Sequence, residues 1–243
     1  MNHLFLTAIF ISITGLLKAQ SFEGTLTYKA EYKFNVSPDM EKMGVTKEKL
    51  IEKMKNEGTW SDSIKVTYKQ DNYIMYTCFS PAAWSIYRGE TNKIYSFREN
   101  DSVGICIVTD ASIDLEQHMK GSRPVSGNTG ITVDVNGWEC EVVRVAWKTG
   151  KYDFYFHPSS FKIDPALYTN HIYDGWAPYL NLSHALPIKI VKSIYDVGSV
   201  TLILSSYKEE KVDDKIFNIP ELIPDSDLNA IKIANRELMR IKK

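Results

Sequence analysis

The fold is decided by the stretch Phe22-Glu-Gly-Thr-Leu-Thr-Tyr-Lys-Ala-Glu-Tyr-Lys-Phe34. Its even positions are apolar, aromatic or glycine, and its odd positions are all polar. Side chains alternate between the two faces of a strand, so this pattern predicts a β-strand with one apolar and one polar face. The stretch is longer than an ordinary strand, and such length is typical of a strongly bent sheet. We therefore expect a curved antiparallel sheet around an apolar interior.

The residues before this stretch predict export. Residues 1–20 read as a cleavable signal peptide, because the apolar run 4–17 is too short to span a bilayer comfortably and Ala19 supplies a small residue for cleavage. No cysteine lies near the junction, so we expect no lipid anchor there. No later apolar run is long enough to predict a transmembrane segment. These features predict a periplasmic or secreted protein.

Charge and composition narrow the class of partner. The chain has 29 Lys and Arg against 30 Asp and Glu, giving a net charge of −1, and the charges are dispersed. Nucleic-acid binding normally requires a concentrated basic surface, so we expect no nucleic-acid partner. No linker rich in proline, serine or glycine divides residues 21–243, which predicts a single domain.

The rest of the chain predicts a β meander with helical additions. The Asn136-Gly137 pair between two β-rich runs is a strong hairpin signal, and residues 121–130 read as a polar loop. Ser37 and Pro38 open a helical excursion to residue 57, with an apolar stripe that we expect to lie across the sheet as a lid. A second amphipathic helix is predicted in the C-terminal tail, at about 226–242. The other candidate strands are 63–69, 73–79, 84–87, 93–98, 103–109, 131–135, 138–147, 152–156, 187–195 and 199–207. The expected fold class is thus mainly β (α+β): one curved antiparallel sheet forming an incomplete barrel, with an amphipathic helical lid and a C-terminal helix.

Residues 157–186 form a long aromatic segment with little periodicity. Its aromatic side chains either form a binding lip over the open end of the sheet or pack the segment onto the core, and packing is the more common role. The aromatic residues concerned are Phe161, Tyr168, Tyr173, Trp176 and Tyr179.

Catalytic and metal-binding signatures are absent from the sequence. There is no nucleophile elbow, zinc-binding helix motif, phosphate loop or dinucleotide fingerprint. His157, His171 and His184 fall in or beside the long segment, but their spacings match no metal-ligand pattern. We therefore expect a protein that is not an enzyme and that carries no cofactor and no metal.

Three cysteines remain in the predicted mature chain: Cys78, Cys106 and Cys140. An oxidising compartment permits one disulfide among them, with one thiol left over. The sequence leaves all three pairings open.

The order of three short motifs carries a family resemblance. These are Phe22-x-Gly-x-Leu-x-Tyr28, Asn136-Gly-Trp-Glu-Cys140 and Phe217-Asn-Ile-Pro220, with Leu186-Pro187 before a last hairpin. This order resembles exported families of Gram-negative bacteria that look like the periplasmic lipoprotein carrier (LolA-like) superfamily. The resemblance implies an incomplete antiparallel barrel covered by helices and able to shelter a lipid or acyl chain. It transfers no ligand-binding residue, because the carriers use an apolar surface and no fixed motif.

Together these observations predict an exported, non-enzymatic protein that binds or carries a lipid or another hydrophobic ligand in the cell envelope. The alternative is an envelope scaffold or interaction module with a filled core, whose protein partner is unknown. The residues expected to contact a ligand are the inward positions of the first strand, the apolar stripe of the lid and the aromatic segment: Leu26, Tyr28, Tyr32, Met43, Leu50, Met54, Tyr173, Trp176 and Tyr179.

Overall fold

A computed structural model describes residues 21–56, 60–78, 83–98, 104–224 and 235–242. In this part of the chain, thirteen strands form one open antiparallel sheet in the order β12-β13-β6-β5-β4-β3-β2-β1-β11-β10-β9-β8-β7. The strands are β1 Gly24–Phe34, β2 Ser63–Lys69, β3 Asn72–Thr77, β4 Ala83–Arg88, β5 Lys93–Arg98, β6 Ile105–Asp110, β7 Val125–Val135, β8 Trp138–Ala146, β9 Gly150–Phe156, β10 Lys189–Ile194, β11 Gly198–Glu209, β12 Leu222–Pro224 and β13 Arg236–Ile241. The helices are α1 Pro38–Lys42, α2 Lys47–Asn56, α3 Leu115–Lys120 and α4 Trp176–Ser183, with short 3-10 turns η1 Pro165–Tyr168, η2 Tyr173–Gly175 and η3 Asp214–Phe217. The prediction of a mainly β chain with one open antiparallel sheet is confirmed.

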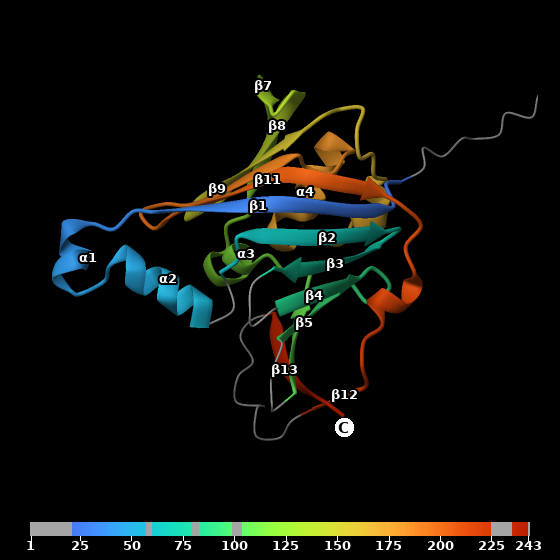
Figure 1. Cartoon of the computed structure of the whole chain (residues 1–243), viewed down its shortest axis with the longest axis horizontal. Helices are drawn as coiled ribbons and strands as arrows, with labels where there is room; N and C mark the ends of the chain where they lie inside the picture. Colours follow the sequence, from blue (N-terminus) through green and yellow to red (C-terminus); the bar gives the residue numbers. More distant parts are fainter. Residues whose placement is uncertain (1–20, 57–59, 79–82, 99–103, 225–234, 243) are drawn as a thin grey trace, which may run out of the picture.

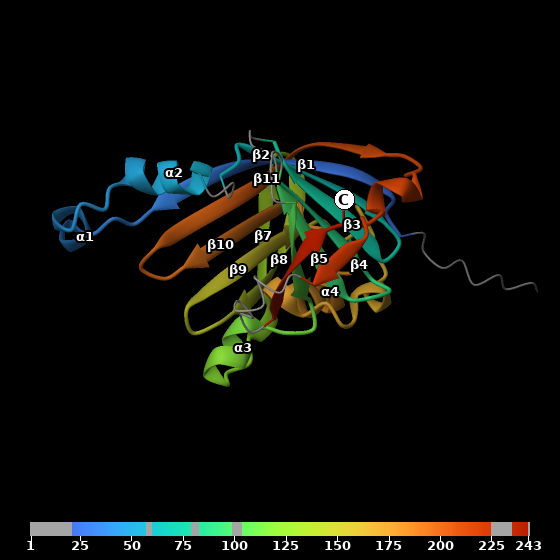
Figure 2. The ribbon, with the colours of Figure 1, turned by 90° about the horizontal axis from the view of Figure 1, so that it is seen from below.

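Strand β1 lies in the middle of this sheet, where it pairs with β2 on one side and β11 on the other. Its even positions face the interior as the alternation predicts: Leu26 and Tyr28 are buried, whereas Lys29 and Glu31 are exposed. From β1 the two halves of the sheet, β2–β6 and β7–β11, diverge to opposite sides (Figures 1 and 2). The sheet is therefore curved around a concave face.

The concave face carries the larger of two apolar cores, and much of it comes from the long aromatic segment. Residues 157–186 contain η1, η2 and α4, and a bridge between Lys162 and Ala185 connects the two parts of this segment. Tyr168 and Tyr179 are fully buried, and Tyr179 stacks on Phe154 of β9 at 4.3 Å between ring centroids. The segment thus fills part of the concavity.

A second core lies on the opposite face of β3–β6. There Ile74, Ile86 and Phe97 pack against Val212 and Phe217, which follow β11 in the chain.

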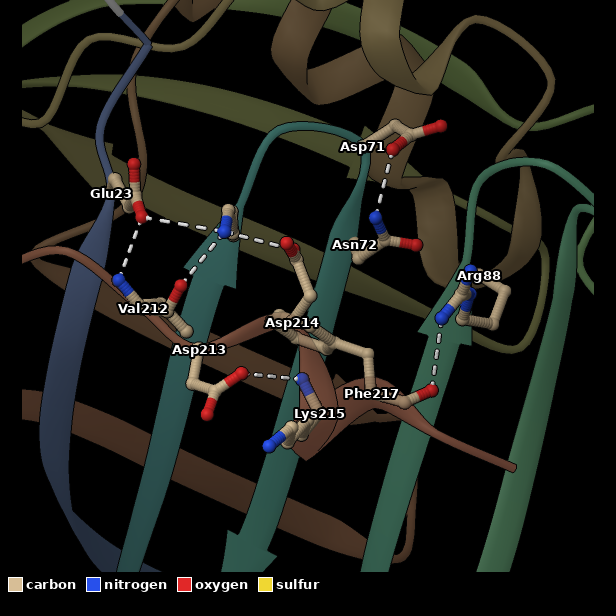
Figure 3. Close-up of polar contacts among 10 residues, drawn as sticks. Glu23, Asp71, Asn72, Arg88, Val212, Asp213, Asp214, Lys215 and Phe217 are labelled. Carbon is tan, nitrogen blue, oxygen red and sulfur yellow. Dashed lines mark hydrogen bonds and ion pairs between the residues drawn. The ribbon is translucent and has the colours of Figure 1, made fainter. Parts of the chain in front are cut away.

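Polar contacts fasten this following segment to the strand ends (Figure 3). The backbone N–H of Val212 donates to Glu23 Oε1 at 2.7 Å, and Arg88 Nη1 donates to the Phe217 carbonyl oxygen at 3.0 Å. Lys69 Nζ lies 2.8 Å from both the Val212 carbonyl oxygen and Asp214 Oδ1. Because the second core lies on the face of β3–β6 opposite to the concave face, one layer of strands separates the two apolar cores.

The predicted C-terminal helix is wrong wherever the structure describes the tail. Residues Arg236–Ile241 form strand β13, which pairs with β6, and residues 225–234 lie outside the described residues. Met239 and Ile241 are two positions apart and pack against the second core. Pairing with β6 also satisfies backbone groups that an edge strand would leave open. Strand pairing and period-2 packing thus override the helical spacing of the apolar residues.

Helices α1 and α2 occupy the range predicted for the lid, and Ser37 caps α1 by accepting a hydrogen bond from the backbone N–H of Met40. Neither helix contains a buried residue, and Met43 between them is 75% exposed. In Figure 1, α1 lies beyond the end of β1, and α2 runs back below that end of the strand. The expected position of these helices across the sheet is not confirmed.

The Asn136-Gly137 hairpin is present between β7 and β8, with positive φ at both turn residues (55° and 85°). The predicted loop at 121–130 is wrong in its second half, because β7 already begins at Val125. A register shift between Asn128 and Thr132 interrupts the alternation there, which hides the strand from a period-2 pattern.

Candidate functional site

The concave face contains a cavity of about 370 Å³ between the two halves of the sheet. Strands β1–β6 and β13 line one side, and β9–β11 with the turn at η2 line the other. The cavity lies where the two halves diverge and the aromatic segment does not fill the space.

The register of strands β2–β6 determines which side chains form one wall of this cavity. Val66 pairs with Met75, Met75 with Ser85, Ser85 with Ser96, and Ser96 with Ile107. Directly paired residues of antiparallel strands point to the same face. This row across β2–β6 is therefore a continuous inward surface, in which the two serine hydroxyl groups hydrogen-bond to each other at 2.9 Å.

The opposite wall follows from the same rule. Ile190 of β10 pairs with Phe154 of β9 and with Leu202 of β11, and all three side chains line the cavity. Tyr28 of β1 closes the space between the two walls, and its hydroxyl group donates to the Pro187 carbonyl oxygen at 2.7 Å. Burial raises the pKa of the Tyr28 phenol well above its ordinary value. The walls are therefore mostly apolar and carry no charged side chain.

Polar and charged side chains gather at one end of the cavity, which we call the polar end: His171, Tyr173, Asp174, Lys192 and Arg236. Lys192 Nζ pairs with Asp174 Oδ2 at 2.8 Å, and Arg236 Nη2 donates to Tyr173 Oη at 3.1 Å. Burial disfavours the charged form of Lys192, but the Asp174 carboxylate outweighs this effect and raises the pKa of Lys192 above its ordinary value. Lys192 is therefore a cation that its partner carboxylate balances.

His171 contributes a neutral group to the polar end. It is 2% exposed, and burial lowers its pKa to about 4. Its Nε2 and the Tyr73 hydroxyl group are joined by a 3.0 Å hydrogen bond, and its ring lies 4.4 Å from the Tyr87 ring between centroids. Within the described part of the chain, His171 Nδ1 and Trp176 Nε1 are buried without a hydrogen-bond partner. Both residues line the cavity.

The structure separates the residues expected to contact a ligand into three groups. Tyr28, Tyr173 and Trp176 line the cavity. Leu26 and Tyr179 are fully buried in the core and are not part of the lining. Tyr32 lies outside the lining and stacks on Trp60 at 4.4 Å, while Met43, Leu50 and Met54 lie on or between helices α1 and α2.

The three cysteines are all free in the structure. Cys78 is exposed, Cys106 is buried in the second core and Cys140 in the larger one. Burial raises the pKa of the Cys106 thiol to about 12 and that of Cys140 to about 11, so both are protonated at neutral pH.

Asp174, Lys192 and Arg236 are site residues that the sequence interpretation did not include. One local signal existed for Lys192, which occupies an inward position of β10 after the buried Ile188 and Ile190. A charged residue among inward-facing apolar positions of a strand indicates an oppositely charged partner or a polar site. No local signal existed for Arg236, because its position depends on the pairing of β13 with β6.

Within the described ranges, no group of three or more His, Cys, Asp or Glu side chains is arranged to hold a metal ion. None of the described helices has the length and apolarity needed to cross a membrane.

Comparison with known proteins assigns no family. No family model matches the chain, and no curated protein matches it. Among solved structures, two crystal forms of PNGF-II, C2 and P21, have 12% and 11% sequence identity and a TM-score of 0.41 each. The matches cover 80% and 81% of this chain but only 30% of the PNGF-II chain. At this level the similarity transfers neither a function nor a residue role.

Proposed function

We propose that the chain binds a lipid or another small hydrophobic molecule in the cavity of the concave face, without chemical conversion. The observation that carries this proposal is the cavity itself: about 370 Å³ in volume, with apolar walls and a few convergent polar side chains at one end. Small-molecule sites are typically concave, mostly apolar and about 300–1,000 Å³ in volume. The proposal needs no catalytic residue.

The walls supply the driving force for such binding. Burial of an acyl chain stabilises a complex by about 0.8 kcal/mol per methylene group. Ten methylene groups would contribute about 8 kcal/mol, which exceeds the lower estimates of about 4 kcal/mol for the lost translational and rotational freedom. A single medium-length chain therefore suits the cavity, and the signal peptide predicted in residues 1–20 would place the ligand outside the cytoplasm.

A cavity-filling variant tests the proposal. Ser96 lines the cavity on β5, so Ser96→Phe replaces part of the open volume with a ring. The probe is N-phenyl-1-naphthylamine, a neutral dye whose fluorescence rises in apolar surroundings. We expect saturable binding to the unaltered protein and at least tenfold weaker binding to Ser96→Phe.

The matched control is Ser206→Phe, which adds the same ring at an exposed position of β11 outside this cavity. Circular dichroism and thermal melting identify any variant that fails to fold. Equal affinity of a folded Ser96→Phe protein and the Ser206→Phe protein would contradict the proposal.

A further inference from the structure

Arg236 is the least compensated charge of the polar end. Lys192 and Asp174 form an ion pair at 2.8 Å and cancel each other. Arg236 donates to the neutral hydroxyl group of Tyr173, and no carboxylate among the described residues forms an ion pair with it. A guanidinium group has five N–H donors, of which this contact uses one. The polar end therefore carries one net positive charge at neutral pH.

Arg236 lies where its charge is accessible from both the cavity and the solvent. Arg236 pairs with Thr109 on β6, and both side chains line the cavity. Arg236 is exposed, and the neighbouring lining residue Ile107 is 37% exposed. A ligand whose chain lies between the apolar walls would thus bring its other end to Arg236 without burying a charge completely, which avoids most of the desolvation cost.

We propose that the ligand is an amphiphile with one acyl chain and an anionic carboxylate headgroup, and that Arg236 binds the headgroup. The inference rests on the proposed function, because it assigns the chemistry of the same cavity. A planar guanidinium matches a carboxylate through two parallel hydrogen bonds. Tyr173 is a positioning residue, because its hydroxyl group holds the Arg236 side chain at the cavity. The balanced Lys192–Asp174 pair leaves Arg236 as the group that distinguishes charged from neutral headgroups.

Two ligands of equal chain length test this inference: decanoate and decanol, each measured by displacement of N-phenyl-1-naphthylamine. We expect the unaltered protein to bind decanoate at least tenfold more tightly than decanol. Arg236→Met keeps an unbranched side chain but removes the guanidinium charge, so it should abolish this preference by weakening decanoate binding at least tenfold. Arg236→Lys, which keeps a positive charge, should retain part of the preference.

Lys33→Met is the matched control, because Lys33 is an exposed cation on β1 outside the cavity lining. It should leave the decanoate preference intact. Equal binding of decanoate and decanol by the unaltered protein would overturn the headgroup inference while the proposed function stands, and so would a decanoate preference that survives in a folded Arg236→Met protein. If the protein binds neither ligand and no dye, the proposed function fails and the headgroup inference fails with it.

Discussion

At the scale of single residues, the clearest consequence of the fold concerns His171. Its ring is enclosed by the aromatic rings of Tyr73, Tyr87, Tyr168 and Trp176. Water is excluded from a group that would otherwise titrate near neutral pH, and the pKa falls from 6.5 to about 4. The folded state therefore holds His171 neutral in conditions where the unfolded chain would protonate it.

This difference predicts an acid-sensitive term in stability. The contribution of His171 is complete above pH 6.5 and is lost as the pH falls from 6.5 to about 4, because the unfolded state then binds a proton that the folded state does not. A shift of this size corresponds to about 3 kcal/mol. The His171→Phe variant keeps a ring but cannot titrate, so the stability of the unaltered protein relative to this variant should fall by about 3 kcal/mol between pH 7.5 and pH 4.

Urea unfolding of both proteins at several pH values measures this term. The hydrogen bond that Tyr73 loses in the variant adds a constant offset and does not alter the slope with pH. Parallel stability curves for the two proteins would show that His171 is not the buried neutral group described above.

At the scale of secondary-structure elements, the pairing of β1 with β11 is the central contact of the sheet, and Gly24 is one of the points where the two backbones approach closely. Gly24 has a φ of +146°, and a Cβ atom there would overlap the backbone carbonyl oxygen of Lys208. Gly127 on β7 has no atom within 4 Å of the equivalent position. The two glycines therefore form a matched pair within the same sheet.

We expect Gly24→Ala to lower the free energy of unfolding by at least about 2 kcal/mol, because it adds both backbone strain and a steric overlap. Gly127→Ala should change it by no more than about 0.5 kcal/mol, as is usual for open surface positions. Chemical denaturation monitored by circular dichroism gives both values. Similar small effects for the two variants would mean that β1 and β11 do not approach as closely as the register indicates.

Local sequence patterns predict some of these elements correctly and others wrongly. The strands at 63–69 and 93–98 are predicted to the residue, because short alternating runs end there at turn residues. The C-terminal tail is mispredicted because Leu238 and Ile241 satisfy a helical spacing, while Met239 and Ile241 satisfy a strand spacing equally well. The choice between helix and strand depends on pairing with the edge of β6 that β5 leaves free. A local pattern cannot contain that information, since the two strands are distant in the sequence.

At the scale of the whole molecule, the curved sheet has opposite faces with different roles. On its convex side, the second core around Phe97 and Phe217 covers β3–β6. Its concave side is filled at one end by the aromatic segment and left open as a cavity at the other. The sequence predicts the curvature from β1 alone, but the polar end of the cavity joins residues 171–174, 192 and 236 through tertiary structure. The site could therefore be predicted only in part, from Tyr28 and the aromatic segment.

The most direct test of a ligand-binding concave face is the position of a bound acyl chain. Intermolecular nuclear Overhauser effects between decanoate methylene protons and labelled methyl groups of the protein measure this position. Binding on the concave face predicts contacts to Met75, Ile64 and Ile190 of the cavity and none to Met239 or Ile219 of the second core. At saturating decanoate, contacts only to the methyl groups of the second core, or no contacts to the cavity methyl groups, would contradict binding on the concave face.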